Sequence, residues 1–214
     1  MIVRYTHCIM PRVSKQHLDA RRQQILGAAR RCFIQKGFKA TSMQDILEEA
    51  GVSTGAVYRY FKNKDELITT IASEGLQAVA AELEDVLSSD DPPPLDQVMG
   101  RVIETITEMQ ASSQLPSLAI QIWAEASHAP EMRQWLMETI NRLRTLFTHL
   151  IGVYQSKGTI SSDFPPEAAG QVLVTLLPGL LLQISITGDV DAESFRNGLR
   201  DLMSSNGPIS PKAV

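Results

Sequence analysis

Residues 41–67, which read TSMQDILEEAGVSTGAVYRYFKNKDEL, constrain the fold more than any other part of the chain. Thr41 and Gln44 have the spacing of a capping box, which predicts the start of a helix. Apolar residues then recur on one helical face: Met43, Ile46, Leu47 and Ala50. Gly51 follows, at a position where helices commonly end in a left-handed residue that glycine adopts without strain. The chain is therefore expected to turn after Ala50.

A second short helix is predicted after this turn. Ser53 or Thr54 can cap it, and Val57 and Phe61, four residues apart, face the same buried side. The side chains left facing outward are small, hydroxylated or aromatic: Thr54, Gly55, Ala56, Tyr58 and Tyr60. Small side chains let a helix backbone approach a DNA groove closely. Two such helices joined by a tight turn are typical of a helix-turn-helix, whose second helix enters the major groove.

The charge of the chain is divided unevenly along its length. Residues 1–64 contain twelve Lys and Arg against four Asp and Glu, a net charge of +8, whereas the remainder carries −12. A basic module joined to an acidic body is the distribution expected when one end binds phosphates. It favours DNA binding over the alternative, a plain helical corner in an all-helical protein with half-buried tyrosines.

The same segment resembles the signature of the tetracycline-repressor (TetR) family of bacterial transcription regulators. The matching positions are Gly51, Val52, Ser53, Gly55, Val57, Tyr58, Tyr60, Phe61, Lys64 and Leu67, extended upstream by Ala28, Phe33, Gly37, Phe38, Thr41 and Ile46. The resemblance implies a ligand-responsive repressor that binds a double-stranded, pseudo-palindromic operator as a homodimer and is released by a small-molecule inducer. It also assigns DNA contacts to eight residues: Thr41, Ser42, Thr54, Gly55, Ala56, Tyr58, Tyr60 and Lys64.

Helical periodicity continues to the C-terminus and no alternating strand pattern occurs, so an all-α fold of about nine helices is expected. The predicted organisation is a flexible basic arm at 1–18, a three-helix DNA-binding head at 19–64, a ligand-binding and dimerisation domain at 65–206 and a flexible tail at 207–214. Met10 resembles the usual family start, so residues 1–9 are a candidate upstream extension. The fourth helix, starting at Lys64 behind an Asn63 cap, is expected to link head and body.

Composition is that of an ordinary globular protein. The two cysteines give no disulfide framework, and Cys32 is expected to be a small core residue. No signal peptide and no membrane-spanning run is predicted, because the most apolar stretch, 172–186, is short and interrupted. A cytoplasmic location follows as the simplest expectation.

The helix at 173–186 is apolar on nearly every side, which predicts that two faces are covered. One cover is the bundle core and the other is the same helix of a second subunit, joined by the last helix. The predicted dimer-interface residues are Leu173, Leu177, Leu180, Leu181, Ile184, Phe195, Leu199 and Leu202. A fully buried central helix is the competing interpretation. Pro178 interrupts this helix without a functional explanation from sequence.

The resemblance also implies a ligand pocket in the body. Its candidate lining residues are apolar, aromatic or sulfur-containing: Met99, Ile103, Met109, Trp123, Phe147 and Tyr154. Stripes of this kind are more often plain core. A lipophilic cation is one candidate inducer, because Glu104, Glu108 and Glu125 lie near Trp123 in sequence or at helical spacing.

The sequence gives little support to other classes of function. The four histidines show no metal-ligand spacing, and neither a glycine-rich phosphate loop nor a nucleophile elbow occurs. An enzyme, a metal site and a cofactor are therefore not expected. A DNA-binding adaptor that recruits a protein partner and senses no ligand remains the alternative function.

Overall fold

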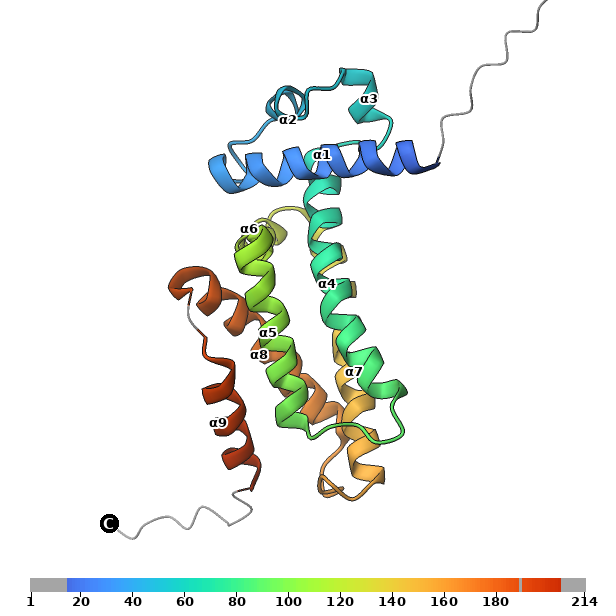
Figure 1. Ribbon diagram of the computed structural model, residues 1–214, viewed down its shortest axis with the longest axis vertical. Helices are drawn as coiled ribbons and strands as arrows, with labels where there is room; N and C mark the ends of the chain where they lie inside the picture. The colour runs from blue at the N-terminus through green and yellow to red at the C-terminus, as the bar shows by residue number, and fades with distance from the viewer. Residues whose placement is uncertain (1–14, 189, 205–214) are drawn as a thin grey trace, which may run out of the picture. The chain divides into compact units, whose positions relative to one another are not determined.

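The computed structural model describes residues 15–188 and 190–204, and within these residues the backbone forms nine α-helices and no strand (Figure 1). The predicted all-α class is confirmed. The helices are α1 (Lys15–Lys36), α2 (Met43–Ala50), α3 (Thr54–Tyr58), α4 (Lys64–Ser88), α5 (Leu95–Ser113), α6 (Leu115–Ala126), α7 (Pro130–Ser156), α8 (Pro166–Thr187) and α9 (Ala192–Ser204).

The chain forms two compact units that divide between Leu67 and Ile68, inside α4. The first unit holds α1 to α3 and the first turn of α4, and the second holds the remaining helices. Helix α1 begins at Lys15, four residues before the expected start at Asp19, so the predicted arm at 1–18 overlaps it. The candidate start at Met10 and the predicted tail at 207–214 lie outside the described residues.

Local capping patterns locate several helix starts. The Asn63 side-chain oxygen accepts from the Glu66 backbone N–H at 2.8 Å, and α4 begins at Lys64 as predicted. The Asp191 carboxylate likewise accepts from the Ser194 N–H at 2.9 Å, directly before α9. Gly51 ends α2 with φ 62° and ψ 37°, the left-handed conformation expected of it.

The predicted capping box of α2 was wrong by one residue. Ser42 is the N-cap: its hydroxyl accepts from the Asp45 N–H at 3.1 Å, and the Asp45 carboxylate accepts from the Ser42 N–H at 2.8 Å. Thr41 is buried, and its hydroxyl donates to the Gly37 and Cys32 carbonyls at 2.8 and 3.2 Å. Both pairs have the same spacing in sequence, so only the packing of Thr41 against the end of α1 distinguishes them.

The core of the second unit forms where α4, α5, α7 and α8 meet, around fully buried residues such as Leu83, Met99, Ile103 and Phe147. Helices α7 and α8 share the most extensive backbone contact. They approach so closely that a Cβ built on Gly170 of α8 would lie 2.4 Å from Thr148 Oγ1 and 2.9 Å from the Thr148 backbone nitrogen. Glycine at position 170 therefore sets the spacing of these two helices.

Burial separates the predicted interface residues of α8 and α9 into two groups. Four of them are 1–6 % exposed and pack into the core of their own chain, so they offer almost no surface to a second subunit: Leu173, Leu177, Leu180 and Ile184. Leu181, Phe195 and Leu199 are half-buried against the same core, whereas Leu202 is 77 % exposed. The buried-helix interpretation thus holds for the inner side of α8. Its outer side exposes Val172, Leu182 and Ile186.

Helix α8 is also long and apolar enough to meet a length-and-composition test for crossing a membrane. Buried core helices pass the same test, and the inner side of α8 packs into this core. The sequence prediction of no span relied on a short stretch interrupted at Thr175, Pro178, Gly179 and Gln183, whereas α8 runs unbroken through these residues.

Replacing Gly170 with Ala should destabilise the protein by about 1–3 kcal/mol, because the added methyl forces α7 and α8 apart. Gly152→Ala in α7 is the matched control: no described atom outside its own helix turn lies within 4 Å of the position that its methyl would take. Helix propensity should make this control neutral or stabilising by up to about 1 kcal/mol. Urea unfolding monitored by circular dichroism measures both. Equal stabilities for the two variants would contradict the proposed role of Gly170.

Candidate functional site

Helix α1 holds α2 in place at three points along its length. Gln24 Nε2 donates to the Ala50 carbonyl at 2.8 Å, Arg31 pairs with Glu49 at 2.7 Å, and Lys36 pairs with Asp45 at 2.5 Å. The Lys36 bond, together with the Ser42 hydroxyl, holds the pKa of the Asp45 carboxyl well below its usual range. Several of the basic residues of α1 are therefore used inside the unit.

Helix α3 is anchored by two apolar side chains and presents the rest outward. Val57 and Phe61 are buried in the core of the first unit, as predicted from their spacing. Thr54 and Gly55 are exposed, Tyr58 is 49 % exposed, and Ala56 and Tyr60 are half-buried. These five residues, all at least partly exposed on or just after α3, are here called the α3 surface. It has the size and side-chain types of a helix that enters a DNA groove.

Lys64 has a role that the sequence did not predict. Its ammonium donates to the carbonyls of Phe38, Lys39 and Thr41 at 2.9, 3.3 and 3.2 Å, and it lies 4.5 Å from the centre of the Phe38 ring. These three bonds use all the donors that a lysine has. Lys64 is therefore a clamp between the first turn of α4 and the segment that precedes α2. The phosphate contact expected of it is not supported.

Two further predicted DNA contacts have structural roles. The Thr41 hydroxyl is occupied by the carbonyls at the end of α1, and Thr41 is only 2 % exposed. Ser42 is exposed, but its hydroxyl is used by the α2 cap, where it also donates to Asp45 at 2.6 Å. Of the eight predicted residues, the structure brings together the five of the α3 surface and assigns Thr41, Ser42 and Lys64 to the scaffold beneath it.

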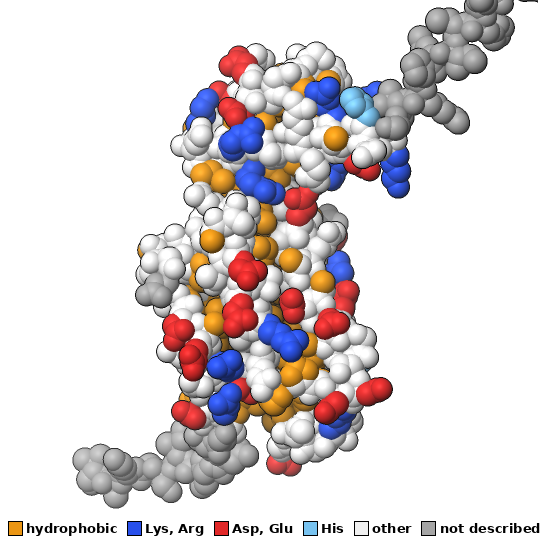
Figure 2. Space-filling view, viewed as in Figure 1, with side chains coloured by type: hydrophobic (Ala, Val, Ile, Leu, Met, Phe, Trp, Pro, Cys, Tyr) orange, Lys and Arg blue, Asp and Glu red, His pale blue; other side chains and the backbone are white. Residues whose placement is uncertain are grey.

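Cations flank the α3 surface. Arg59 and Lys62 are exposed at the C-terminal end of α3, and the Arg22 guanidinium lies 5.5 Å from the centre of the Phe61 ring. Figure 2 shows Lys and Arg side chains spread over the visible face of this unit. Arg59 and Lys62 are better placed for phosphate contact than Lys64. Their exposure, which sequence spacing alone does not reveal, is what distinguishes them.

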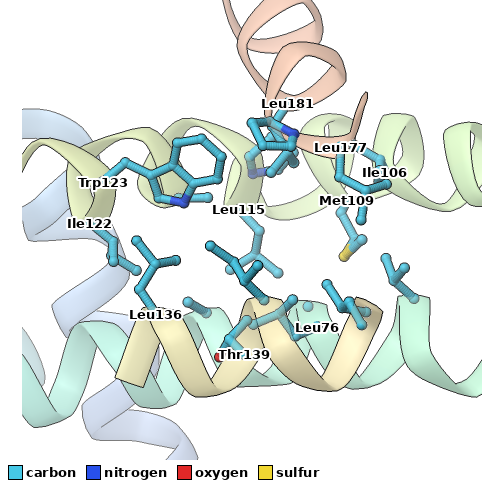
Figure 3. Close-up of a pocket in the computed structure, with 18 of the residues that line it drawn as sticks. Leu76, Ile106, Met109, Leu115, Ile122, Trp123, Leu136, Thr139, Leu177 and Leu181 are labelled. Atoms are coloured by element: carbon cyan, nitrogen blue, oxygen red, sulfur yellow. The ribbon is translucent and has the colours of Figure 1, made fainter. Parts of the chain in front are cut away.

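The second unit contains a partly open apolar cavity of about 100 Å³ lined by α4, α5, α6, α7 and α8 (Figure 3). Leu76, Leu136 and Thr139 lie on one side in this view, and Trp123, Met109 and Leu177 lie opposite them. The full lining is Ala72, Gly75, Leu76, Val79, Ile106, Met109, Leu115, Pro116, Ala119, Ile122, Trp123, Trp135, Leu136, Thr139, Ile140, Leu143, Val174, Leu177, Pro178 and Leu181.

Two of the six predicted lining residues, Met109 and Trp123, line the cavity. The other four were wrong, since Met99, Ile103 and Phe147 are fully buried in the core. Tyr154 is also buried, and its hydroxyl donates to the Pro93 carbonyl; burial raises the pKa of Tyr154 to about 12. Helical stripes identify inward-facing residues, but they do not tell which of them border a gap and which fill one.

Among the described residues, the cavity wall contains no charged side chain. Glu104, Glu108 and Glu125 are absent from its lining, which removes the carboxylates on which the lipophilic-cation hypothesis rested. Polar residues occur instead in an adjacent hollow between α4 and α7, which shares Leu76, Trp135, Thr139 and Leu143 with the cavity. Ser73, Gln77, Glu138 and Arg142 line that hollow.

The clamp role of Lys64 is separable from phosphate binding by the salt dependence of DNA affinity. Lys64→Met should weaken DNA binding while leaving the slope of log K against log salt unchanged, because no phosphate contact is lost. Lys62→Met, the matched exposed control, should reduce that slope by about 1. Fluorescence anisotropy with labelled duplex DNA across a salt series measures both. A slope change in Lys64→Met equal to that of Lys62→Met would refute the clamp.

Comparison with known proteins is consistent with this geometry. Residues 25–71 match the model of bacterial regulatory proteins of the tetR family, and residues 94–205 match the C-terminal domain of BetI-type transcriptional repressors. The HTH-type transcriptional repressor Rv1474c of Mycobacterium tuberculosis is 42% identical over 179 residues, which cover 82% of this chain and 88% of the relative.

Solved structures show the same fold. Salmonella enterica GusR superposes with a TM-score of 0.74 at 24% identity, covering 90% of this chain and 98% of its own. A SmeT–triclosan complex gives a TM-score of 0.72 at 21% identity, covering 86% and 90%. The helix-turn-helix head, the cavity-bearing helical body and the sequence matches over both units show that this chain belongs to the TetR family of bacterial transcription regulators.

Proposed function

We propose that this regulator is a cytoplasmic repressor that binds a pseudo-palindromic operator as a homodimer and is released when a small molecule occupies the cavity of the second unit. One observation carries the proposal: a single continuous helix, α4, serves both sites. Its first turn holds Lys64, which clamps the segment before α2, and its next turns contribute Ala72, Gly75, Leu76 and Val79 to the cavity wall.

The size of the cavity supplies a reason for ligand binding to shift α4. Pockets for drug-sized ligands typically have volumes of about 300–1,000 Å³, several times the volume of this cavity. We infer that a larger ligand is accommodated by displacement of these walls. Helix α4 contributes Leu76 and Val79 to that wall and is continuous with the turn that holds Lys64, so we infer that its displacement couples the cavity to the first unit.

A ligand that fits only the expanded state shifts the equilibrium toward that state by its differential affinity for the two states. In that state α4 would no longer hold Lys64 in register with the carbonyls of Phe38 and Thr41. Because those carbonyls directly precede the α2 cap at Ser42, the geometry of α2 and the α3 surface would change. DNA affinity should fall as a result.

The homodimer is proposed to form on the outer side of α8 and the end of α9. Val172, Leu182 and Ile186 are exposed on α8, and Leu202 and Met203 are exposed on α9. Apolar side chains repeated along the outside of a helix are unusual on a monomer surface, and a two-fold interface would cover them with the same residues of a second copy. A two-fold dimer presents two α3 surfaces, as a pseudo-palindromic site requires.

The adaptor alternative is not favoured. An adaptor needs no apolar cavity, and a solved structure of the same fold is a triclosan complex. A ligand sensor should gain thermal stability with some small molecule and lose DNA affinity in its presence, whereas an adaptor should do neither.

The experiment that tests the proposal uses the DNA upstream of the protein's own gene. Wild-type protein should bind it far more tightly than random DNA, and Tyr58→Ala, on the α3 surface, should weaken specific binding by about 1–3 kcal/mol. A thermal-shift screen then identifies stabilising compounds, which should lower the operator affinity. Stabilising compounds that leave DNA binding unchanged would argue against an inducer mechanism.

The interface is tested by Ile186→Glu combined with Leu202→Glu, which should convert a dimer to a monomer in analytical ultracentrifugation, because two exposed apolar contacts become charged. Met137→Glu is the matched control, since Met137 is an apolar residue on α7 that is also largely exposed, at 58 %. It should leave the dimer intact. Dimers that persist in the double variant would place the interface elsewhere.

A further inference from the structure

Pro178 lies inside α8 and on the wall of the cavity. Proline has no backbone N–H, so the regular helical hydrogen bond from residue 178 to the Val174 carbonyl cannot form. A proline in a helix interior costs about 3 kcal/mol relative to alanine. Pro178 nevertheless occurs here, beside Leu177 and Leu181, two α8 residues that also line the cavity (Figure 3).

Helix geometry places the freed carbonyl beside the Pro178 ring. In a helix the N–H of residue i points at the carbonyl of residue i−4, and in proline the ring occupies the place of that hydrogen. Pro178 and Val174 both border the cavity, and from this geometry we infer that the Val174 carbonyl oxygen is accessible from the same space. The apolar wall therefore contains one hydrogen-bond acceptor from the backbone.

The remainder of the wall restricts the ligand further. Its described lining has no charged side chain, and Thr139 provides the only hydroxyl there. Burying a charge in this cavity without a partner would be strongly unfavourable, whereas a neutral group that donates to an unpaired carbonyl satisfies both groups. Indole rings of Trp123 and Trp135 add flat apolar area.

We infer that the cavity selects an uncharged, largely apolar molecule carrying one hydrogen-bond donor, such as a hydroxyl, which binds the Val174 carbonyl freed by Pro178. The inference rests on the proposed function in that it takes this cavity as the inducer site. It adds the chemical class of the inducer and gives a role to the proline, which the sequence left without one.

Tryptophan fluorescence reports on this site, because both tryptophans of the chain line the cavity; a Trp135→Phe background leaves Trp123, which lines the cavity and not the adjacent hollow. Four one-ring probes test the wall: phenol and toluene, which match in shape and differ in the donor, and benzoate and benzylammonium, which carry opposite charges. One-ring probes are used because the cavity, at about 100 Å³, is small; benzene occupies an engineered apolar cavity of about 150 Å³ in another protein. Phenol should bind, and the two charged probes should not.

Pro178→Ala is the decisive variant, because it restores an N–H that occupies the Val174 carbonyl. It should weaken phenol binding about threefold to tenfold more than toluene binding, the usual range for one hydrogen bond, because the loss of the ring from the wall affects both probes and the hydrogen bond affects phenol alone. The variant should fold, since removing an interior proline stabilises the helix. Gly179→Ala is the matched control: it also favours the helix, has no described neighbour within 4 Å of its methyl position, and is outside the cavity lining. It should leave both affinities unchanged.

Equal weakening of phenol and toluene in Pro178→Ala, absence of phenol binding to the wild type, or binding of either charged probe comparable to that of phenol would overturn the inference. DNA binding of the same variants without probe is measured in parallel. If the wild type shows the expected probe selectivity but binds no operator, the proposed function fails and the assignment of ligand class stands. If it binds its operator without that selectivity, only the ligand class fails.

Discussion

The clamp of Lys64 on the carbonyls of Phe38, Lys39 and Thr41 holds the DNA-binding head in its working geometry. It fixes the segment from which α2 starts, and α2 positions the turn at Gly51 and hence α3. The Lys64 ammonium donates to three backbone carbonyls and also lies over the Phe38 ring. Its position is therefore more constrained than that of a lysine in a surface ion pair. The orientation of the α3 surface is thereby tied to the first turn of α4.

Further along the chain, α4 has a second role. A sensor needs an element whose position can differ between two states. Helices α7 and α8 pack closely at Gly170 and Thr148 and form part of the cavity wall. Helix α4 adds Leu76 and its neighbours to the same wall. One helix is therefore held to the first unit through Lys64 and is also part of the cavity, so its position bears on both.

Local patterns predicted much of the fold because their physics is local. Asn63 and Asp191 cap the helices that follow them, Gly51 adopts the left-handed conformation, and Val57 and Phe61 face inward together. Predictions failed where two neighbouring residues fitted the same local pattern, or where burial determined what a side chain contacts. Ser42 rather than Thr41 caps α2, since Thr41 is drawn against the end of α1. The sequence position of Lys64 indicates a phosphate contact. Its hydrogen bonds to carbonyls more than twenty residues away in sequence, which no local pattern indicates, give it the role of a clamp.

Residue order was enough to predict the all-helical class, the helix-turn-helix and the family, because periodicity, caps and turn glycines are encoded within a few residues. Which apolar residues surround empty space became known only from the packed helices. Phe147 and Trp123 were both expected to line a pocket, yet the first fills the core and the second borders the cavity. Packing likewise buries Leu177 within its own chain and leaves Ile186 exposed. These distinctions depend on how helices distant in sequence approach one another, which no pattern within a single helix specifies.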